Sequence, residues 1–333
     1  MKLLKRLCTA NGISGREENI KSIIKKEISG LCDISEDRFG NLIATVHGKK
    51  RDKRVCYFAH TDEVGFIISD YDEQGFARFV NVGGIDAAVL PGKVLCSGRR
   101  KGVIGVCPVH LLSASDKETV LKSEDLFIDF GFEDKKQAEK RLPVGSAIYF
   151  EPTFYQAGNE IFAKALDDRI GVRIMIDMIK SKPLYDTTFV FTCCEETGTQ
   201  GAETAAYGLN TDIGVILECT TSAQTPDENG GKAVTLLGGG AVISYRDNGT
   251  MYDTELFALA TSVAEKNGIK WQTKTLVAGG NDASAVQKTA YGASVAAFSV
   301  AARNLHSAIS VANKNDYFSV LKLAKAFNDV IGL

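Results

Sequence analysis

The sequence predicts an α/β protein in which a sheet domain is interrupted by an inserted domain of β-strands. Apolar strand-like runs alternate with helical stretches near the N-terminus and again after about residue 154. Between these parts lie short strand candidates separated by glycine. This sequence pattern is typical of a small β-barrel or β-sandwich. The length of 333 residues fits about two domains. We therefore predict an α/β sheet domain from residues 1–66 plus 154–333 and an inserted β domain at 67–153.

The N-terminal elements are predicted from their apolar spacing. Residues 2–9 and 16–29 are expected to be helices, and Ser14 is a candidate N-cap for the second. Strands are expected at 41–46 and 54–60. The run VCYFA within 54–60 is unbroken and apolar, as in a central strand that is covered on both faces.

The remaining elements follow from the same patterns. In the insertion, strands are expected at 66–71, 76–82, 93–97, 102–109, 126–131 and 147–151, with one helix at 134–141. After it, helices are expected at 168–181, 198–209, 253–268, 280–290 and 315–332. Strands are expected between them at 187–194, 213–219, 271–277 and 293–300.

Composition excludes several classes of protein. With 44% hydrophobic and 24% charged residues the chain is neither disordered nor fibrous, and its net charge of −2 provides no basic field for nucleic acid or a membrane surface. No apolar stretch reaches the ~18 residues of a membrane span, and the N-terminus does not resemble a signal peptide. The eight cysteines are scattered without a CxxC pair. We expect buried, reduced thiols in a cytoplasmic protein.

Ligand-type side chains stand at the ends of predicted strands. His60 ends the strand at 54–60, and Asp62 follows it at a spacing that lets a carboxylate orient the imidazole. Asp167 and Asp168 open a helix, where helix capping alone could explain them. Each of these features also has an ordinary structural explanation.

Four further residues complete the pattern. Glu195 and Glu196 follow a buried strand, and since neighbours on a strand point to opposite sides we expect them to have different roles. Glu218 ends the next apolar strand, and His306 follows the last one. Two histidines with several carboxylates suit two divalent metal ions bridged by a carboxylate.

These motifs resemble the co-catalytic metallo-aminopeptidases of the glutamyl, deblocking and tetrahedral (TET) type, some of which carry cellulase or endoglucanase names. The resemblance covers essentially the whole chain, through AHTDEVGFII, AKALDDRIGV, EETGTQGA, GGNDAS and RNLHS in the family's order. It implies a three-layer, phosphorylase/hydrolase-like sheet domain with a β-barrel insertion. It also implies an assembly of dimers, often a dodecamer, in which the insertion makes contacts.

The resemblance also implies roles for single residues. His60 and Glu218 would bind one metal, Glu196 and His306 the other, and Asp167 would bridge both. Glu195 would be the general acid/base, and Asp62 would hold His60 in its tautomer. Two metal ions per subunit are expected, zinc first, with cobalt or manganese as alternatives. The substrates would be short peptides cleaved at their N-terminus. Asn281 stands where members of this family often have threonine. The residues of the specificity pocket are therefore not defined by the resemblance.

Three other functions are compatible with parts of this pattern. A glycosidase is disfavoured because adjacent glutamates cannot flank one bond at the ~5–10 Å that two catalytic carboxyls need. A dinuclear deacylase or carboxypeptidase would be favoured by an arginine that reaches the metals. A non-catalytic metal-binding assembly protein also remains open, although Glu195 argues against it.

Overall fold

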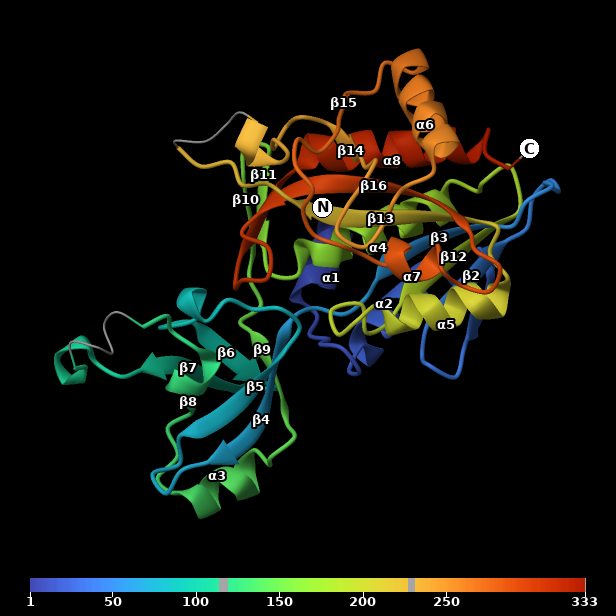
Figure 1. Ribbon diagram of the computed structural model, residues 1–333. Coiled ribbons are helices and arrows are strands. Elements are labelled where there is room, and N and C mark those ends of the chain that lie inside the picture. The colour runs from blue at the N-terminus through green and yellow to red at the C-terminus, as the bar shows by residue number, and fades with distance from the viewer. Residues whose placement is uncertain (114–118, 227–230, 333) are drawn as a thin grey trace.

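The structure is a computed structural model that describes residues 1–113, 119–226 and 231–332. A large sheet with helices on both faces lies beside a smaller closed barrel (Figure 1). This three-layer arrangement with a separate β unit confirms the predicted fold class. No helix among the described residues is long and apolar enough to cross a membrane.

The large sheet is mixed, with a parallel centre. Its order is β1 (Asp33–Glu36), β2 (Leu42–Val46), β12 (Thr187–Thr192), β3 (Val55–His60), β13 (Ile213–Thr221), β16 (Ser294–Arg303), β17 (Ser310–Asn313), β11 (Glu160–Ala163) and β10 (Phe154–Ala157). Two short strands, β14 (Ala241–Ile243) and β15 (Trp271–Gln272), extend it beside β16. β12, β3, β13 and β16 run parallel, so their carboxyl ends meet at one edge of the sheet.

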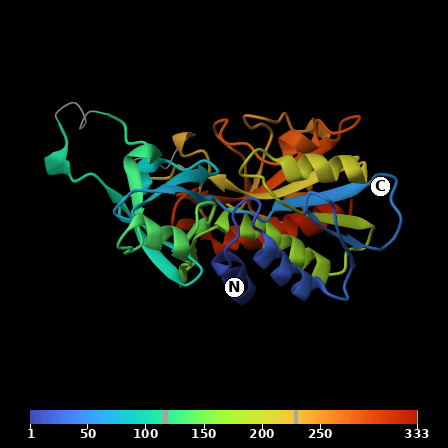
Figure 2. The ribbon, with the colours of Figure 1, turned by 90° about the horizontal axis from the view of Figure 1, so that it is seen from below.

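Helices cover the two faces of this sheet unequally (Figure 2). The larger apolar core includes residues of α1 (Lys2–Thr9), α2 (Glu18–Ile28), α4 (Leu166–Lys180), α6 (Thr254–Lys266) and α8 (Lys314–Asn328). The smaller core includes residues of α5 (Gln200–Leu209) and α7 (Ala283–Val286). In β3, Tyr57 and Ala59 pack in the first core and Cys56 and Phe58 in the second. Both faces of β3 are therefore buried, which explains its unbroken apolar run.

The barrel is closed by six antiparallel strands. They run in the order β4 (Gly65–Tyr71), β5 (Ala77–Val82), β8 (Leu126–Asp129), β7 (Arg100–Val106), β6 (Val94–Ser97) and β9 (Ala147–Phe150). The helix α3 (Lys135–Arg141) packs on it, and 3₁₀ turns lie at Ala87–Val89, Val109–Leu111 and Ser123–Asp125. A further 3₁₀ turn, Gly231–Ala233, lies outside the barrel, between β13 and β14. The barrel has its own apolar core. The domain boundaries at 66/67 and 153/154 stay a prediction.

Several local predictions were wrong. The strand predicted at 271–277 ends at Gln272, because the chain then leaves β14 and the Thr275 N–H donates to the carbonyl of Val234 (3.0 Å). The helix predicted at 280–290 is reduced to α7. Ser14 does not cap α2, which begins at Glu18, but donates its hydroxyl to Asp62 (2.6 Å).

Candidate metal centre

The parallel strands bring the predicted ligands to one edge of the sheet. His60 is the last residue of β3 and pairs in register with Thr192, the last residue of β12. Glu218 lies in β13, two residues beyond the Ile216 that pairs with Phe58 of β3, and is therefore level with His60. Sheet register alone thus places an imidazole and a carboxylate side by side.

Asp167 faces both histidines. Its Oδ1 lies 3.3 Å from Nε2 of His60, and its Oδ2 lies 3.5 Å from Nε2 of His306. The two imidazoles come from distant parts of the chain, the end of β3 and the loop after β16. A carboxylate between two imidazoles, with one oxygen toward each, has the arrangement of a bridging ligand.

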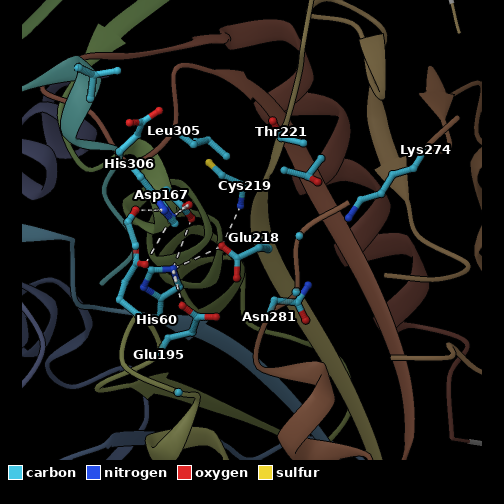
Figure 3. Close-up of a pocket in the computed structure, with 18 residues that line it drawn as sticks. His60, Asp167, Glu195, Glu218, Cys219, Thr221, Lys274, Asn281, Leu305 and His306 are labelled. Carbon is cyan, nitrogen blue, oxygen red and sulfur yellow. Dashed lines mark hydrogen bonds and ion pairs between the residues drawn. The ribbon is translucent and has the colours of Figure 1, made fainter. Parts of the chain in front are cut away.

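One further carboxylate accompanies each histidine. Glu218 Oε1 is 3.5 Å from Nε2 of His60, and Glu196 Oε2 is 3.4 Å from Nε2 of His306. Nitrogen and oxygen atoms of His60, Asp167 and Glu196 also lie within 4.8 Å of one another. The structure therefore brings all five predicted ligand residues together around one cavity of about 670 Å³ (Figure 3).

Glu195 is separate from these groups, for a different reason than the sequence predicted. β12 ends at Thr192, and Cys194 adopts a left-handed φ of 55°, so both glutamates lie in a turn and not on a strand. The turn directs Glu196 toward His306, whereas Glu195 Oε2 lies 3.9 Å from Nε2 of His60. Their different surroundings follow from the turn geometry.

Asp62 organises this turn as well as His60. Its carboxylate accepts hydrogen bonds from the main-chain N–H groups of Glu195 and Glu196, both at 3.1 Å, and from the hydroxyl of Ser14. Nδ1 of His60 is closer to the Asp62 carbonyl oxygen (3.1 Å) than to its carboxylate (3.5 Å). A hydrogen bond from Nδ1 to this carbonyl leaves Nε2 free to face the cavity.

The centre contains more buried carboxylates than cationic side chains. Burial raises the pKa of Glu195 and Glu218 well above the usual value and raises that of Glu196 to about 7. The hydrogen bond from His306 to Asp167 raises the pKa of His306 to about 9. Within the described ranges, no lysine or arginine forms an ion pair with these carboxylates. Buried carboxylates need cations, and the donor set of two imidazoles and several carboxylates fits divalent metal ions.

Asp168 has a different role from Asp167, to which it is joined by a cis peptide bond. Its Oδ1 accepts from the N–H of Gly171 (2.9 Å), which agrees with the helix-capping interpretation. Asp167, Asp168 and Cys219 are close enough to form a second candidate group. The thiol of Cys219, however, donates to the Leu166 carbonyl, and burial raises its pKa well above the usual value. Thiolate ligation is therefore disfavoured there.

A buried ion-pair cluster that sequence reasoning missed supports the ligand segments. Lys164 donates a hydrogen bond to Glu63 at 2.6 Å. Lys164 lies three residues before Asp167, and Glu63 lies three residues after His60. Arg169 lies 3.5 Å from the same carboxylate and also bonds to the carbonyl of Leu7. Lys164 and Arg169 flank the Asp167–Asp168 pair in an otherwise apolar stretch, and this was the signal available in the sequence.

The barrel also contributes to the centre. Nδ1 of His306 donates to the carbonyl of Gly84, in the loop after β5, at 2.8 Å. Gly83 has a φ of 83°, and a Cβ built on it would lie 2.7 Å from Cγ1 of Val64 and 3.3 Å from Oε2 of Glu196. The barrel loop thus touches two of the predicted ligands.

We expect Gly83→Ala to weaken metal binding about 10-fold, because the added methyl group presses on Glu196. Metal affinity, measured by titration of the metal-free protein, checks this. Gly145→Ala is the matched control, since Gly145 is a barrel glycine with a φ of 86° whose Cβ would meet no atom within 4 Å. Equal affinities of the two variants would show that the loop does not position Glu196.

Comparison with known proteins identifies the family of the chain. The family model described as M42 glutamyl aminopeptidase matches residues 40–323. The chain belongs to this family. It is 30% identical to the lysyl aminopeptidase of Pyrococcus furiosus, over 97% of this chain and 95% of the relative. It is therefore a peptidase hydrolase of the metal-dependent aminopeptidase class, as the resemblance implied.

Two solved structures show the same fold. The TET1 peptidase of Pyrococcus horikoshii, described as able to assemble into a tetrahedron or a large octahedral shell, superimposes with a TM-score of 0.86 at 32% identity, over 99% of both chains. A Thermotoga maritima protein titled endoglucanase gives 0.81 at 32% identity, over 97% of this chain and 95% of that one. The latter title agrees with the older names expected within this family.

Proposed function

We propose that this aminopeptidase removes N-terminal residues from short peptides with two divalent metal ions held in the centre described above. The observation that carries the proposal is the position of Asp167, whose two carboxylate oxygens face separate histidines. Each histidine has its own glutamate, so two similar half-sites share one carboxylate.

In this proposal His60, Asp167 and Glu218 hold one ion. His306, Asp167 and Glu196 hold the other. When bound, two such ions act as Lewis acids that lower the pKa of water and polarise a peptide carbonyl. Zinc is the expected ion, and cobalt and manganese accept the same ligands.

Glu195 is the proposed general acid/base. Its carboxylate lines the cavity beside His60 and is not one of the half-site groups. Its Oε atom takes the proton of the attacking water and then gives it to the nitrogen of the leaving amine. Asp62 holds the main-chain N–H groups of the Glu195–Glu196 turn and thereby fixes where this proton transfer takes place.

An aminopeptidase fits this cavity better than a deacylase or carboxypeptidase. Carboxylates dominate the described lining near the histidines, a field that attracts the ammonium group of a free N-terminus. None of the described residues that line the cavity is an arginine, the feature that would favour the deacylase alternative.

The test is a pair of chromogenic peptides that differ only by N-acetylation, assayed with metal-free protein and after zinc, cobalt or manganese is returned. We expect no turnover without metal, and with metal at least about 100-fold faster cleavage of the free amine. This factor corresponds to about 2.7 kcal/mol, the scale of one lost charge-assisted contact. Equal rates on both peptides would instead indicate an endopeptidase or deacylase.

The proposed enzyme is an assembly of several copies of this chain and acts in the cytoplasm. Because the related TET1 peptidase is described as assembling into a tetrahedron or a large octahedral shell, we propose a homo-oligomer built from dimers, with a dodecamer as the expected form. In this assembly the inserted domain of residues 67–153 makes contacts and controls substrate access. The proposed compartment is the cytoplasm, where free thiols such as the eight of this chain stay reduced.

A further inference from the structure

The cavity of the metal centre holds one cation far from the histidines, Lys274. The residue follows β15 and lines the same cavity as the metal-ligand candidates. Figure 3 shows its amino group directed toward the space between Glu218, Asn281 and Thr221. No sequence pattern assigns this lysine a role.

Lys274 is buried and incompletely partnered. It is only 5% exposed, and its Nζ donates to the carbonyl of Ala278 at 3.0 Å. No carboxylate of the described chain lies within ion-pair distance of it, so none of its three donors has a carboxylate partner among these residues. Burial lowers its pKa. An ammonium group held in this way is costly unless a ligand supplies the missing negative charge.

The acidic groups around Lys274 are already occupied. Asp247 accepts hydrogen bonds from the N–H groups of Gly249 and Thr250 and from the hydroxyl of Tyr252 (2.6 Å). Glu218 accepts from the N–H of Cys219 and faces His60. Neither carboxylate is positioned to neutralise the lysine directly.

Open space adjoins the lysine. Gly279 and Gly280 also line the cavity, and a Cβ built on either would meet no atom within 4 Å. A side chain of several atoms can therefore enter between these glycines and the β13 wall at Glu218. The nearby amide of Asn281 is already bonded to Tyr252 and to the N–H of Ala283, whereas Lys274 has a hydrogen bond only to the carbonyl of Ala278 among the described residues.

We propose that Lys274 forms the end of the subsite for the substrate's N-terminal side chain and selects a carboxylate there, as in glutamyl and aspartyl peptides. This inference rests on the proposed function. Family membership does not decide it, because the family is described as glutamyl whereas a 30% identical relative is a lysyl aminopeptidase. An N-terminal lysine would meet a like charge in this cavity.

The experiment compares glutamyl and glutaminyl p-nitroanilides, which have the same shape and differ in charge. With metal bound, the ratio of kcat/KM for glutamyl over glutaminyl substrate should be on the order of 10–100 in the unmodified enzyme, the size of a charge-assisted hydrogen bond. Lys274→Met should bring this ratio near 1. Lys274→Arg, which keeps the charge, should retain part of the preference.

Lys270→Met is the matched control. Lys270 lies four residues earlier and also donates to a main-chain carbonyl, that of Gly238 at 2.6 Å, but it is exposed and does not line the cavity. This variant should keep the glutamyl preference. A loss of preference in Lys270→Met equal to that in Lys274→Met would assign the effect to the local fold.

Two results would overturn the inference. One is a ratio at or below 1 in the unmodified enzyme, which needs no variant and does not depend on whether Lys274→Met folds. The other is an equal loss on both substrates in a folded Lys274→Met, as expected if the lysine binds the peptide main chain. Failure of the proposed function is distinct, because then no free-amine substrate is cleaved with any metal.

Discussion

Replacing Glu195 by glutamine is expected to lower kcat by about 10²–10⁴-fold while the metal content stays unchanged. The amide has the same shape as the carboxylate but cannot take a proton from water. Because Glu195 Oε2 lies 3.9 Å from His60 and outside both half-sites, its loss removes no proposed ligand. Steady-state kinetics with elemental analysis of the same preparation measures both quantities.

Glu196→Gln is the neighbouring control. Glu196 lies 3.4 Å from His306, so its substitution should lower the metal content as well as the rate. The pair separates the two roles at adjacent positions of one turn. If Glu195→Gln loses metal and Glu196→Gln keeps it, the assignments of the two residues are reversed.

The centre could be anticipated from the sequence because its residues stand at the ends of parallel strands. The apolar runs before His60 and Glu218 identify buried strands, and parallel strands bring their carboxyl ends to one edge. The positions of these residues at strand ends were therefore enough to predict that they meet at one edge of the sheet. The residue roles came from the family resemblance.

Contacts between segments that share no local pattern could not be anticipated. The carbonyl of Gly84, which holds His306, belongs to the barrel and lies 222 residues away in the chain. Ser14 has the sequence context of a helix cap, but its hydroxyl is taken by Asp62. Lys274 lies where a strand was predicted, but β15 ends at Gln272 and the lysine lines the cavity.

The least predictable elements are short or exposed strands. β1 is exposed at all four residues, so it carries no alternation of apolar and polar positions. β10 and β11 have four residues each and are held mainly by pairing with each other and with β17. Such strands form because neighbouring strands pair with them, and their own sequences give little signal.

Asp167→Asn is expected to abolish binding of both metal ions, because one side chain serves both half-sites. An amide offers one oxygen in place of two and no charge to offset the ions, and Asp167 is the group that faces both His60 and His306. Activity should fall below detection. A second measurement is thermal unfolding, since a ligand at ~100 times its Kd stabilises the native protein by about 2.7 kcal/mol.

That stabilisation should be present in the unmodified enzyme and absent in Asp167→Asn. Asp168→Asn is the matched control, because an asparagine there still offers an oxygen to the N–H of Gly171 and faces neither histidine. It should keep the metal-dependent shift of the unfolding temperature. Retention of two ions by Asp167→Asn would refute the bridging role, and loss of one ion would assign Asp167 to a single half-site. Loss of both ions in Asp167→Asn alone is the result that a shared carboxylate requires.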